Sequence, residues 1–168
     1  MAAPDIVRAT ASDIVTIQKI AANTWPATYN AILSARQLSY MLNKMYNTET
    51  LLAQMNLPDS CFFLAIQNEQ PIGFCHVAVS EKHDTFKLHK LYVLPTVQKS
   101  GAGIALMKTA ENYAGNAGAS NLLLNVNRDN NAFGFYKKHG FEILRTEDID
   151  IGQNFFMNDY VLIKRLEK

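Results

Sequence analysis

The chain has 168 residues, of which 48% are hydrophobic and 18% charged, and its formal net charge at pH 7 is +1. This length and composition suffice for one sizeable core, so we expect one domain over residues 1–168. The near-neutral charge argues against nucleic acid or an anionic membrane as a partner. The opening MAAPDIV lacks the basic and apolar segments of a secretion signal, and no apolar run approaches the roughly 18 residues of a membrane span. We therefore expect a cytoplasmic protein.

The two cysteines, Cys61 and Cys75, are too few for a disulfide framework or a cysteine-rich metal site. Both lie in apolar runs, where a free cysteine behaves as a small hydrophobic residue. If the polar turn at residues 67–70 joins two antiparallel strands, the cysteines fall nearly opposite each other. A reducing cytosol favours free thiols.

The first third of the chain is predicted to be mainly helical. A short strand at residues 6–9 precedes a helix that Ser12 caps and Pro26 ends. Ser34 begins a second helix, and a third occupies about residues 48–55.

The remainder predicts a sheet. Strands at residues 61–66 and 71–79 flank a polar turn, and the strand from Phe86 follows a second turn, which indicates an antiparallel meander. The run LLLNV at 122–126 is typical of a strand covered on both faces, and the intervening helix makes it parallel to the Phe86 strand. A short helix from about Asn130 ends at Gly140, and two further strands at 141–150 and 155–165 form a hairpin. The predicted fold is α/β (α+β), with a mixed, mostly antiparallel sheet of about seven strands flanked by helices.

Residues 86–103, FKLHKLYVLPTVQKSGAG, read as a strand, a glycine loop and the start of a helix. A helix N-terminus carries unpaired N–H groups and a partial positive charge, so it can hold phosphate where glycine keeps the approach open. The lysine of a nucleoside-triphosphate loop is missing after Gly103, and Leu106 replaces the third glycine of a dinucleotide loop. The pattern present is Q-x-x-G-x-G, formed by Gln98, Gly101 and Gly103.

This loop resembles the pyrophosphate loop of the GCN5-related N-acetyltransferases (GNAT), which bind acetyl-coenzyme A. The motifs NxAxxxY and FYKKHGF match the other half of that family's signature, and the resemblance extends over residues 6–166. The segments TWPATYNAILS and VNRDNNAFGFYKKHGF are similar to the bacterial branch that includes polyamine acetyltransferases. The matching residues of the second motif are Asn130, Ala132, Phe135, Tyr136, Gly140 and Phe141.

The resemblance implies the GNAT fold, acetyl-CoA as cosubstrate and no metal. It implies that the parallel strands at 86–93 and 122–126 splay apart, that the pantetheine lies between them, and that backbone N–H groups at 98–104 hold the pyrophosphate. The implied cofactor-binding residues are Leu91, Tyr92, Val93, Gln98, Lys99, Ser100, Gly101, Ala102, Gly103, Ile104, Asn130, Ala132 and Lys138.

The reaction needs a neutral amine, a stabilised oxyanion and a proton for the leaving thiolate. Tyr136 matches the family's general acid, because a phenol is protonated at neutral pH; a purely packing role is the alternative. His89 stands where relatives often carry a glutamate, and its imidazole suits proton acceptance through a water; a structural role is again the alternative. His76 is a weaker candidate, and His83 and His139 are predicted to be exposed.

The acceptor is expected between the first helices and the last hairpin. Trp25, Tyr29 and Tyr46 either belong to the core or line this pocket. The hairpin carboxylates Glu142, Glu147, Asp148 and Asp150 would favour a cationic amine, or they only protect an edge strand. The first hypothesis is a small amine or polyamine, the second a protein amine.

Two other mechanisms stay open at this stage. A cysteine nucleophile would need Cys61 or Cys75 to reach the acetyl group. A non-catalytic acyl-CoA sensor would bind the coenzyme without turnover, although the presence of Tyr136 speaks against it. A homodimer is compatible with the resemblance, but no sequence feature requires one.

Overall fold

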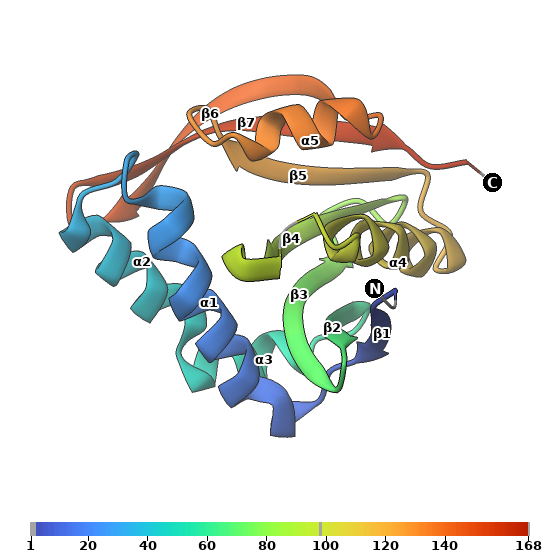
Figure 1. Cartoon of the computed structure of the whole chain (residues 1–168). Helices are drawn as coiled ribbons and strands as arrows, with labels where there is room; N and C mark the ends of the chain where they lie inside the picture. The colour runs from blue at the N-terminus through green and yellow to red at the C-terminus, as the bar shows by residue number, and fades with distance from the viewer. Residues whose placement is uncertain (1–2, 98, 168) are drawn as a thin grey trace.

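The computed structural model describes residues 3–97 and 99–167. Within this part, helices pack on a seven-stranded sheet with the order β1-β2-β3-β4-β5-β7-β6 (Figure 1). Every neighbouring pair is antiparallel except β4 and β5, which are parallel, so the predicted mixed sheet is confirmed. The elements are β1 Asp5–Arg8, α1 Ile14–Tyr29, α2 Ala35–Tyr46, α3 Thr48–Met55, β2 Ser60–Gln67, β3 Gln70–Val79, β4 Thr85–Val93, α4 Ala102–Asn116, β5 Asn121–Asn127, α5 Ala132–Lys138, β6 Glu142–Gly152 and β7 Phe155–Arg165, with short 3₁₀ turns at Ala11–Asp13 and Pro95–Val97.

Side-chain caps begin α2 and α3, at the predicted Ser34 and at Asn47, which the sequence analysis did not single out. The Ser34 hydroxyl accepts a hydrogen bond from the Gln37 N–H at 3.1 Å, and the Asn47 side chain accepts one from the Thr50 N–H at 2.8 Å. Such caps satisfy backbone donors that the first helical turn leaves without partners.

The boundaries of α1 differ from the prediction at both ends. Thr10 and the turn Ala11–Asp13 precede the helix, and the Thr10 N–H donates to Asp13 at 2.9 Å, so Ser12 is not its cap. Pro26 does not end the helix, which continues to Tyr29. A proline removes one backbone hydrogen bond, but burial of the aromatic side chains on either side of it keeps the last turn in place.

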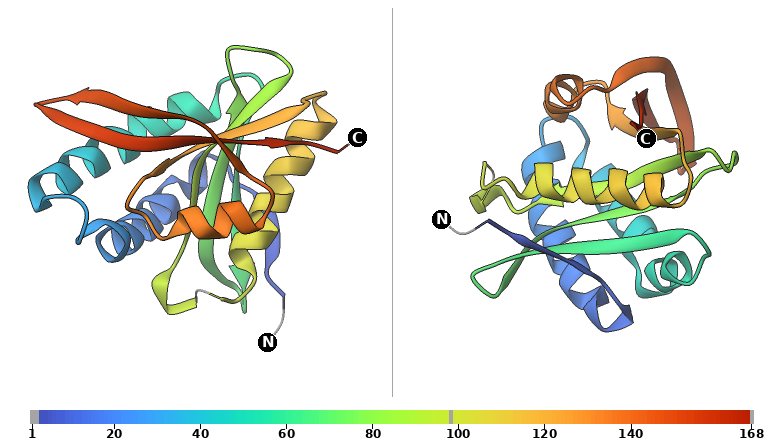
Figure 2. Two further views of the ribbon diagram at one scale, coloured as in Figure 1. Left: turned by 90° about the horizontal axis from the view of Figure 1, so that it is seen from above. Right: turned by 90° about the vertical axis from the view of Figure 1, so that its right-hand side faces the viewer.

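Two hydrophobic cores cover the two faces of the sheet (Figure 2). Helices α4 and α5 pack on one face around Leu106, Leu122 and Phe141, whereas α1, α2 and α3 pack on the other around Ile17, Leu51 and neighbouring aromatic residues. None of the helices in the described chain is long and apolar enough to cross a membrane.

The register of the strands corrects two expectations. Cys61 pairs with Val77 and Cys75 with Phe63, so the cysteines are diagonal neighbours rather than opposite ones, and both are buried free thiols. In β5 only one face is fully buried. The other face, which includes Asn125, is half-buried because it borders a cavity.

Candidate functional site

The parallel strands β4 and β5 part within the sheet. Their pairing runs from Thr85 to Leu88 and from Asn121 to Leu124, and in the described chain no ladder joins them beyond that point. A cleft of about 1070 Å³ opens where they diverge. Its walls include Leu91 and the two residues that follow it on β4. The splayed pair is therefore present, and backbone groups at its mouth are free to pair with an extended ligand.

The N-terminus of α4 opens onto the same cleft. Gly101 precedes the helix with a left-handed φ of 88°, and no side chain caps the first turn. A Cβ atom at Gly103 would lie 3.7 Å from the Phe135 ring, so the loop passes close to α5. Exposed N–H groups and a partial positive charge make this end of α4 suitable for an anion.

The predicted loop residues are distributed unevenly around this cleft. Ala102 is buried and does not line the cavity, and its N–H donates a hydrogen bond to the Ser100 hydroxyl at 3.3 Å. Gln98 lies outside the described residues. The loop residues that line the cleft are Lys99, Ser100, Gly101, Gly103 and Ile104.

Helix α5 forms the opposite wall of the cleft. Tyr136 is only 8% exposed, and its ring packs edge-on against Phe141 with centroids 5.7 Å apart, yet it also borders the cavity. Burial raises the pKa of its phenol, with smaller contributions from Tyr29 and Cys75, so Tyr136 remains protonated at neutral pH. Tyr136 thus combines the packing role and the position on the cleft that the sequence left as alternatives.

The predicted coenzyme-binding residues Asn130, Ala132 and Lys138 also line the cleft. The Asn130 side chain accepts a hydrogen bond from the Ala132 N–H at 2.9 Å and so fixes the start of α5. Lys138 is exposed at the other end of the helix. His139, predicted to be exposed, is instead half-buried beside Phe135, with ring centroids 4.6 Å apart, because α5 folds back onto the loop.

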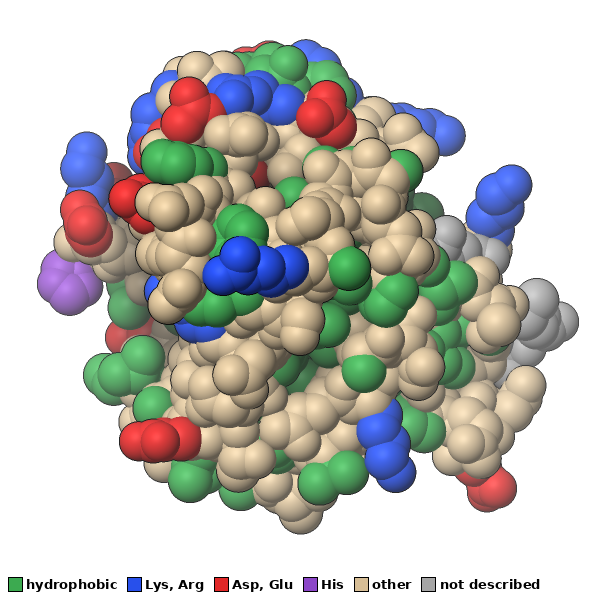
Figure 3. All heavy atoms as spheres, turned by 90° about the vertical axis from the view of Figure 1, so that its left-hand side faces the viewer, with side chains coloured by type: hydrophobic (Ala, Val, Ile, Leu, Met, Phe, Trp, Pro, Cys, Tyr) green, Lys and Arg blue, Asp and Glu red, His purple; other side chains and the backbone are tan. Residues whose placement is uncertain are grey.

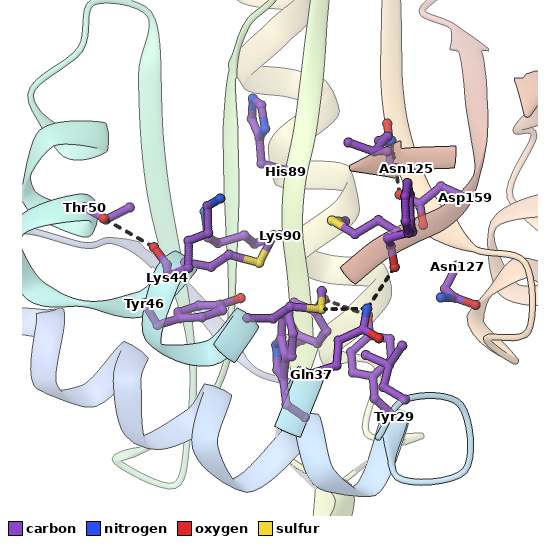
Figure 4. Close-up of a pocket in the computed structure, with 18 of the residues that line it drawn as sticks. Tyr29, Gln37, Lys44, Tyr46, Thr50, His89, Lys90, Asn125, Asn127 and Asp159 are labelled. Carbon is purple, nitrogen blue, oxygen red and sulfur yellow. Dashed lines mark hydrogen bonds between the residues drawn. The ribbon is translucent and has the colours of Figure 1, made fainter. Parts of the chain in front are cut away.

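A second pocket, of about 420 Å³, lies between α1, α2 and the facing side of the sheet (Figure 4). Trp25, Tyr29 and Tyr46 all line it, as one of the two sequence interpretations proposed. The Trp25 ring lies 4.9 Å from the Tyr29 ring and 5.6 Å from the Tyr46 ring, so these residues also form an aromatic cluster of the core. The residues shared by the two cavities are Tyr29, His89, Lys90, Tyr92 and Asn125.

The four hairpin carboxylates do not line the second pocket, which favours the interpretation that they protect an edge strand over the interpretation that they bind the amine. Glu147 pairs with Arg145 at 2.7 Å and Asp148 pairs with Arg128, so arginines near the hairpin neutralise these two side chains. Acidic and basic groups are interspersed on the face formed by α1, α2 and the hairpin tip (Figure 3). Charged residues that do line the pocket are Lys44, Lys87, Lys90 and Asp159.

His89 lies at the point where β4 leaves β5. Its ring stacks on His76 at 5.0 Å, and the His76 ring stacks on Phe62 at 4.1 Å. Partial removal of the ring from water, and then the charges of Lys87 and Lys90, lower the pKa of His89 below its usual value, which favours the neutral imidazole. His76 is buried, with a pKa lowered to about 2 mainly by burial, and its Nε2 lies 2.9 Å from the Ser60 hydroxyl. His89 borders both cavities, and the buried His76 packs against its ring.

Sequence reasoning missed Asp159, which is 2% exposed and lines the second pocket. The Asn125 side chain donates a hydrogen bond to its carboxylate at 3.2 Å. Burial raises the pKa of Asp159, partly offset by that hydrogen bond and by Lys87. The available signal was an acidic residue inside the apolar strand FFMNDYVLI, two residues before the buried Val161.

A metal site was not predicted. Among residues 3–97 and 99–167, no group of three or more histidine, cysteine, aspartate or glutamate side chains is arranged to hold a metal ion.

The sheet contains one parallel pair of strands that part, beside a helix whose N-terminus follows a glycine. This is the architecture expected of an acetyltransferase domain. Residues 58–143 match the family model described as an acetyltransferase (GNAT) domain. The chain belongs to the GNAT family and is an N-acetyltransferase.

Three similar proteins give this assignment detail. A spermidine N(1)-acetyltransferase of Thermoplasma acidophilum is 30% identical over 91% of this chain and 94% of its own. A PaiA N-acetyltransferase from the same organism, solved in complex with coenzyme A, superposes with a TM-score of 0.83 and 27% identity, over 98% of this chain and 99% of that one. The peptidyl-lysine N-acetyltransferase YjaB of Escherichia coli is 33% identical over 68% of this chain and 73% of its own.

Proposed function

We propose that this protein transfers the acetyl group of acetyl-CoA directly to a primary amine. The first candidate acceptor is a small molecule, and the second is a protein. One observation carries the proposal: the cleft where β4 and β5 part and the second pocket share five lining residues, among them His89 and Asn125 at the point of parting. Two substrates can meet there from opposite sides. The related structure in complex with coenzyme A supports the choice of cosubstrate.

The residues of the first cleft suit the two ends of the coenzyme. Backbone groups of Leu91, Tyr92 and Val93 would bind the pantetheine, and one of their N–H groups would polarise the acetyl carbonyl. N–H groups of the loop from Lys99 to Ile104 would bind the pyrophosphate, as the helix N-terminus favours.

Proton transfer is assigned to side chains that face the two cavities. Tyr136, kept protonated by burial, would donate to the leaving thiolate. His89 and Asp159 both line the acceptor pocket and can each accept a proton from the amine, directly or through a water. Asp159 adds a candidate base for which the sequence offered only His89.

The positions of the cysteines favour direct transfer over an acyl-enzyme. Cys61 and Cys75 are buried, and neither lines either cavity. Burial raises the pKa of the Cys75 thiol, which suppresses the nucleophilic thiolate. Trapping of an acetylated cysteine during turnover would contradict this assignment.

The decisive experiment measures thiol release from acetyl-CoA with a panel of amines, beside the Tyr136→Phe variant. Acetylated product with any amine, and much slower turnover in the variant with coenzyme affinity retained, would support the proposal. Tight coenzyme binding with no product from any amine or peptide would instead identify a sensor. Names of the relatives support both a polyamine and a peptidyl lysine for the panel.

A further inference from the structure

We infer that the acceptor amine also carries an anionic group, as an amino acid does, and that Lys87 and Lys90 bind that group. The inference rests on the proposed function and specifies its acceptor. Such an acceptor differs from a polyamine, which carries only positive charge.

A bulge places both lysines on the same face of the sheet. In a regular strand, residues three apart point to opposite faces. Lys90 pairs with His76 and Leu88 pairs with Val77, so His89 is an extra residue without a cross-strand partner. Lys87 and Lys90 consequently both line the pocket beneath α1 and α2.

Neither lysine forms an ion pair with a carboxylate of the described residues, although Glu147 and Asp159 act on Lys87 from a greater distance. Ion pairs in the described chain join Arg128 to Asp148, Arg145 to Glu147 and Lys164 to Glu111, and they leave the pocket lysines out. The Lys90 ammonium donates to the Gln54 side chain at 2.9 Å and lies 5.7 Å from the centre of the Tyr46 ring. An ammonium has three donors, so Lys90 keeps capacity for a ligand. The Lys87 ammonium forms no hydrogen bond to another described residue.

The charges of the two lysines repel each other. Burial and then the charge of Lys87 lower the pKa of Lys90 to about 8. Burial also lowers the pKa of Lys87, although Glu147 and Asp159 partly oppose the change. A half-buried ammonium whose charge is only partly compensated is unfavourable, and an anion bound by the lysines would add to that compensation.

Other groups on the same wall are donors as well. The Trp25 indole N–H and the Tyr46 hydroxyl are buried, and neither makes a hydrogen bond of good geometry within the described residues. The two groups do interact with each other, which lowers the pKa of Tyr46 against the larger effect of burial. Both side chains line the pocket, and an indole N–H can only donate. Donors that are only weakly satisfied suit a ligand that accepts hydrogen bonds.

The opposite wall suits the amine. Figure 4 shows Lys90 on the side of Tyr46 and Asp159 on the side of Asn125. Asp159 is the one carboxylate among the residues that line the pocket in the described chain. Its charge would orient an ammonium toward Asn125, which borders the coenzyme cleft. The pocket therefore matches a zwitterion rather than a polycation.

The test compares amines that differ only in an acidic group. Suitable pairs are butylamine with 4-aminobutyrate, phenethylamine with phenylalanine, cadaverine with lysine, and propylamine with 3-aminopropylphosphonate; spermidine serves as the polycation. We expect kcat/KM to be at least about tenfold higher for the acidic member of the accepted pair, as a charge-assisted contact would give. The phosphonate pair distinguishes a carboxylate from a phosphonate group.

Variants then assign the preference to the lysines. Lys87→Met and Lys90→Met should raise KM for the acidic amine by about tenfold and raise KM for the matched amine without the acidic group much less. Lys90→Arg should keep the preference, and Lys82→Met, an exposed lysine in the β3–β4 turn, is the control. Circular dichroism checks that each variant folds.

Two results separate failure of this inference from failure of the proposed function. A wild-type preference for spermidine or for the members without an acidic group, or an equal loss for both members in the lysine variants, would overturn only the inference. Absence of transfer to every amine would overturn the proposed function and the inference with it. Should a methionine variant fail to fold, competitive inhibition of the wild type by hexanoate, weakened in Lys90→Gln, gives the same decision.

Discussion

Replacement of Gly101 by alanine should separate backbone strain from coenzyme binding. Gly101 precedes α4 with φ at 88°, and Gly118 follows the same helix with φ at 93°. A Cβ atom added at either position meets no other heavy atom within 4 Å. Only Gly101 lines the cleft. Gly118→Ala is therefore a matched control that carries the same strain away from the proposed site.

The magnitudes follow from these geometries. A non-glycine residue in the left-handed region costs about 1–2 kcal/mol, so both variants should lose that much free energy of unfolding. In Gly101→Ala the added methyl group also stands where the pyrophosphate would approach the α4 N-terminus. Loss of one charge-assisted hydrogen bond costs about 1.5–3 kcal/mol, which corresponds to a Kd for coenzyme A raised about 10- to 100-fold.

Urea unfolding followed by circular dichroism measures the strain, and isothermal titration calorimetry with coenzyme A measures the affinity. Both variants should unfold at lower urea than the wild type, and only Gly101→Ala should lose affinity. If Gly101→Ala bound coenzyme A as tightly as the wild type, the pyrophosphate would not lie at this loop. An equal loss of affinity in Gly118→Ala would show that strain in α4, and not the methyl group, weakens binding.

Three further predictions concern the reacting groups. Tyr136→Phe should lower kcat by about 10²-fold and leave the Kd for coenzyme A unchanged; an unchanged kcat in steady-state assays would remove Tyr136 as the acid. Asp159→Asn should reduce kcat/KM at pH values above the raised pKa of Asp159, where the carboxylate is ionised and can accept a proton, and the loss should shrink as pH falls through that pKa; a pH profile identical to that of the wild type would exclude it as base. Because the pKa of Lys90 is lowered to about 8, its charge is present below that pH and lost above it. Inhibition by hexanoate should accordingly weaken as pH rises from about 7 to about 9, and the same pH dependence in Lys90→Met would contradict the role of Lys90.

Local chemistry explains why much of the fold could be predicted from the sequence. The caps at Ser34 and Asn47 depend on side chains that bond to backbone a few residues away. The left-handed conformations of Gly101 and Gly140 depend on the missing Cβ. The end of α1 was mispredicted because burial of Trp25 and Tyr29 outweighs the hydrogen bond that Pro26 cannot make.

The coenzyme cleft was largely predictable, because its loop and α5 are contiguous motifs in the chain. The acceptor pocket was not predictable, because its charged residues come from different strands. Only the folded sheet sets the register between those strands. Hairpin carboxylates that looked available are paired with arginines, one of them Arg128 from outside the hairpin. Asp159 faces the pocket through its contact with Asn125, 34 residues earlier in the chain.

The sequence by itself determined the glycine loop, the order of helices and strands, and the candidate residue for the acid. Only the tertiary structure decided the character of the acceptor pocket. A single extra residue at His89 brings Lys87 and Lys90 to the same face of β4, and that bulge exists only in the pairing of β4 with β3.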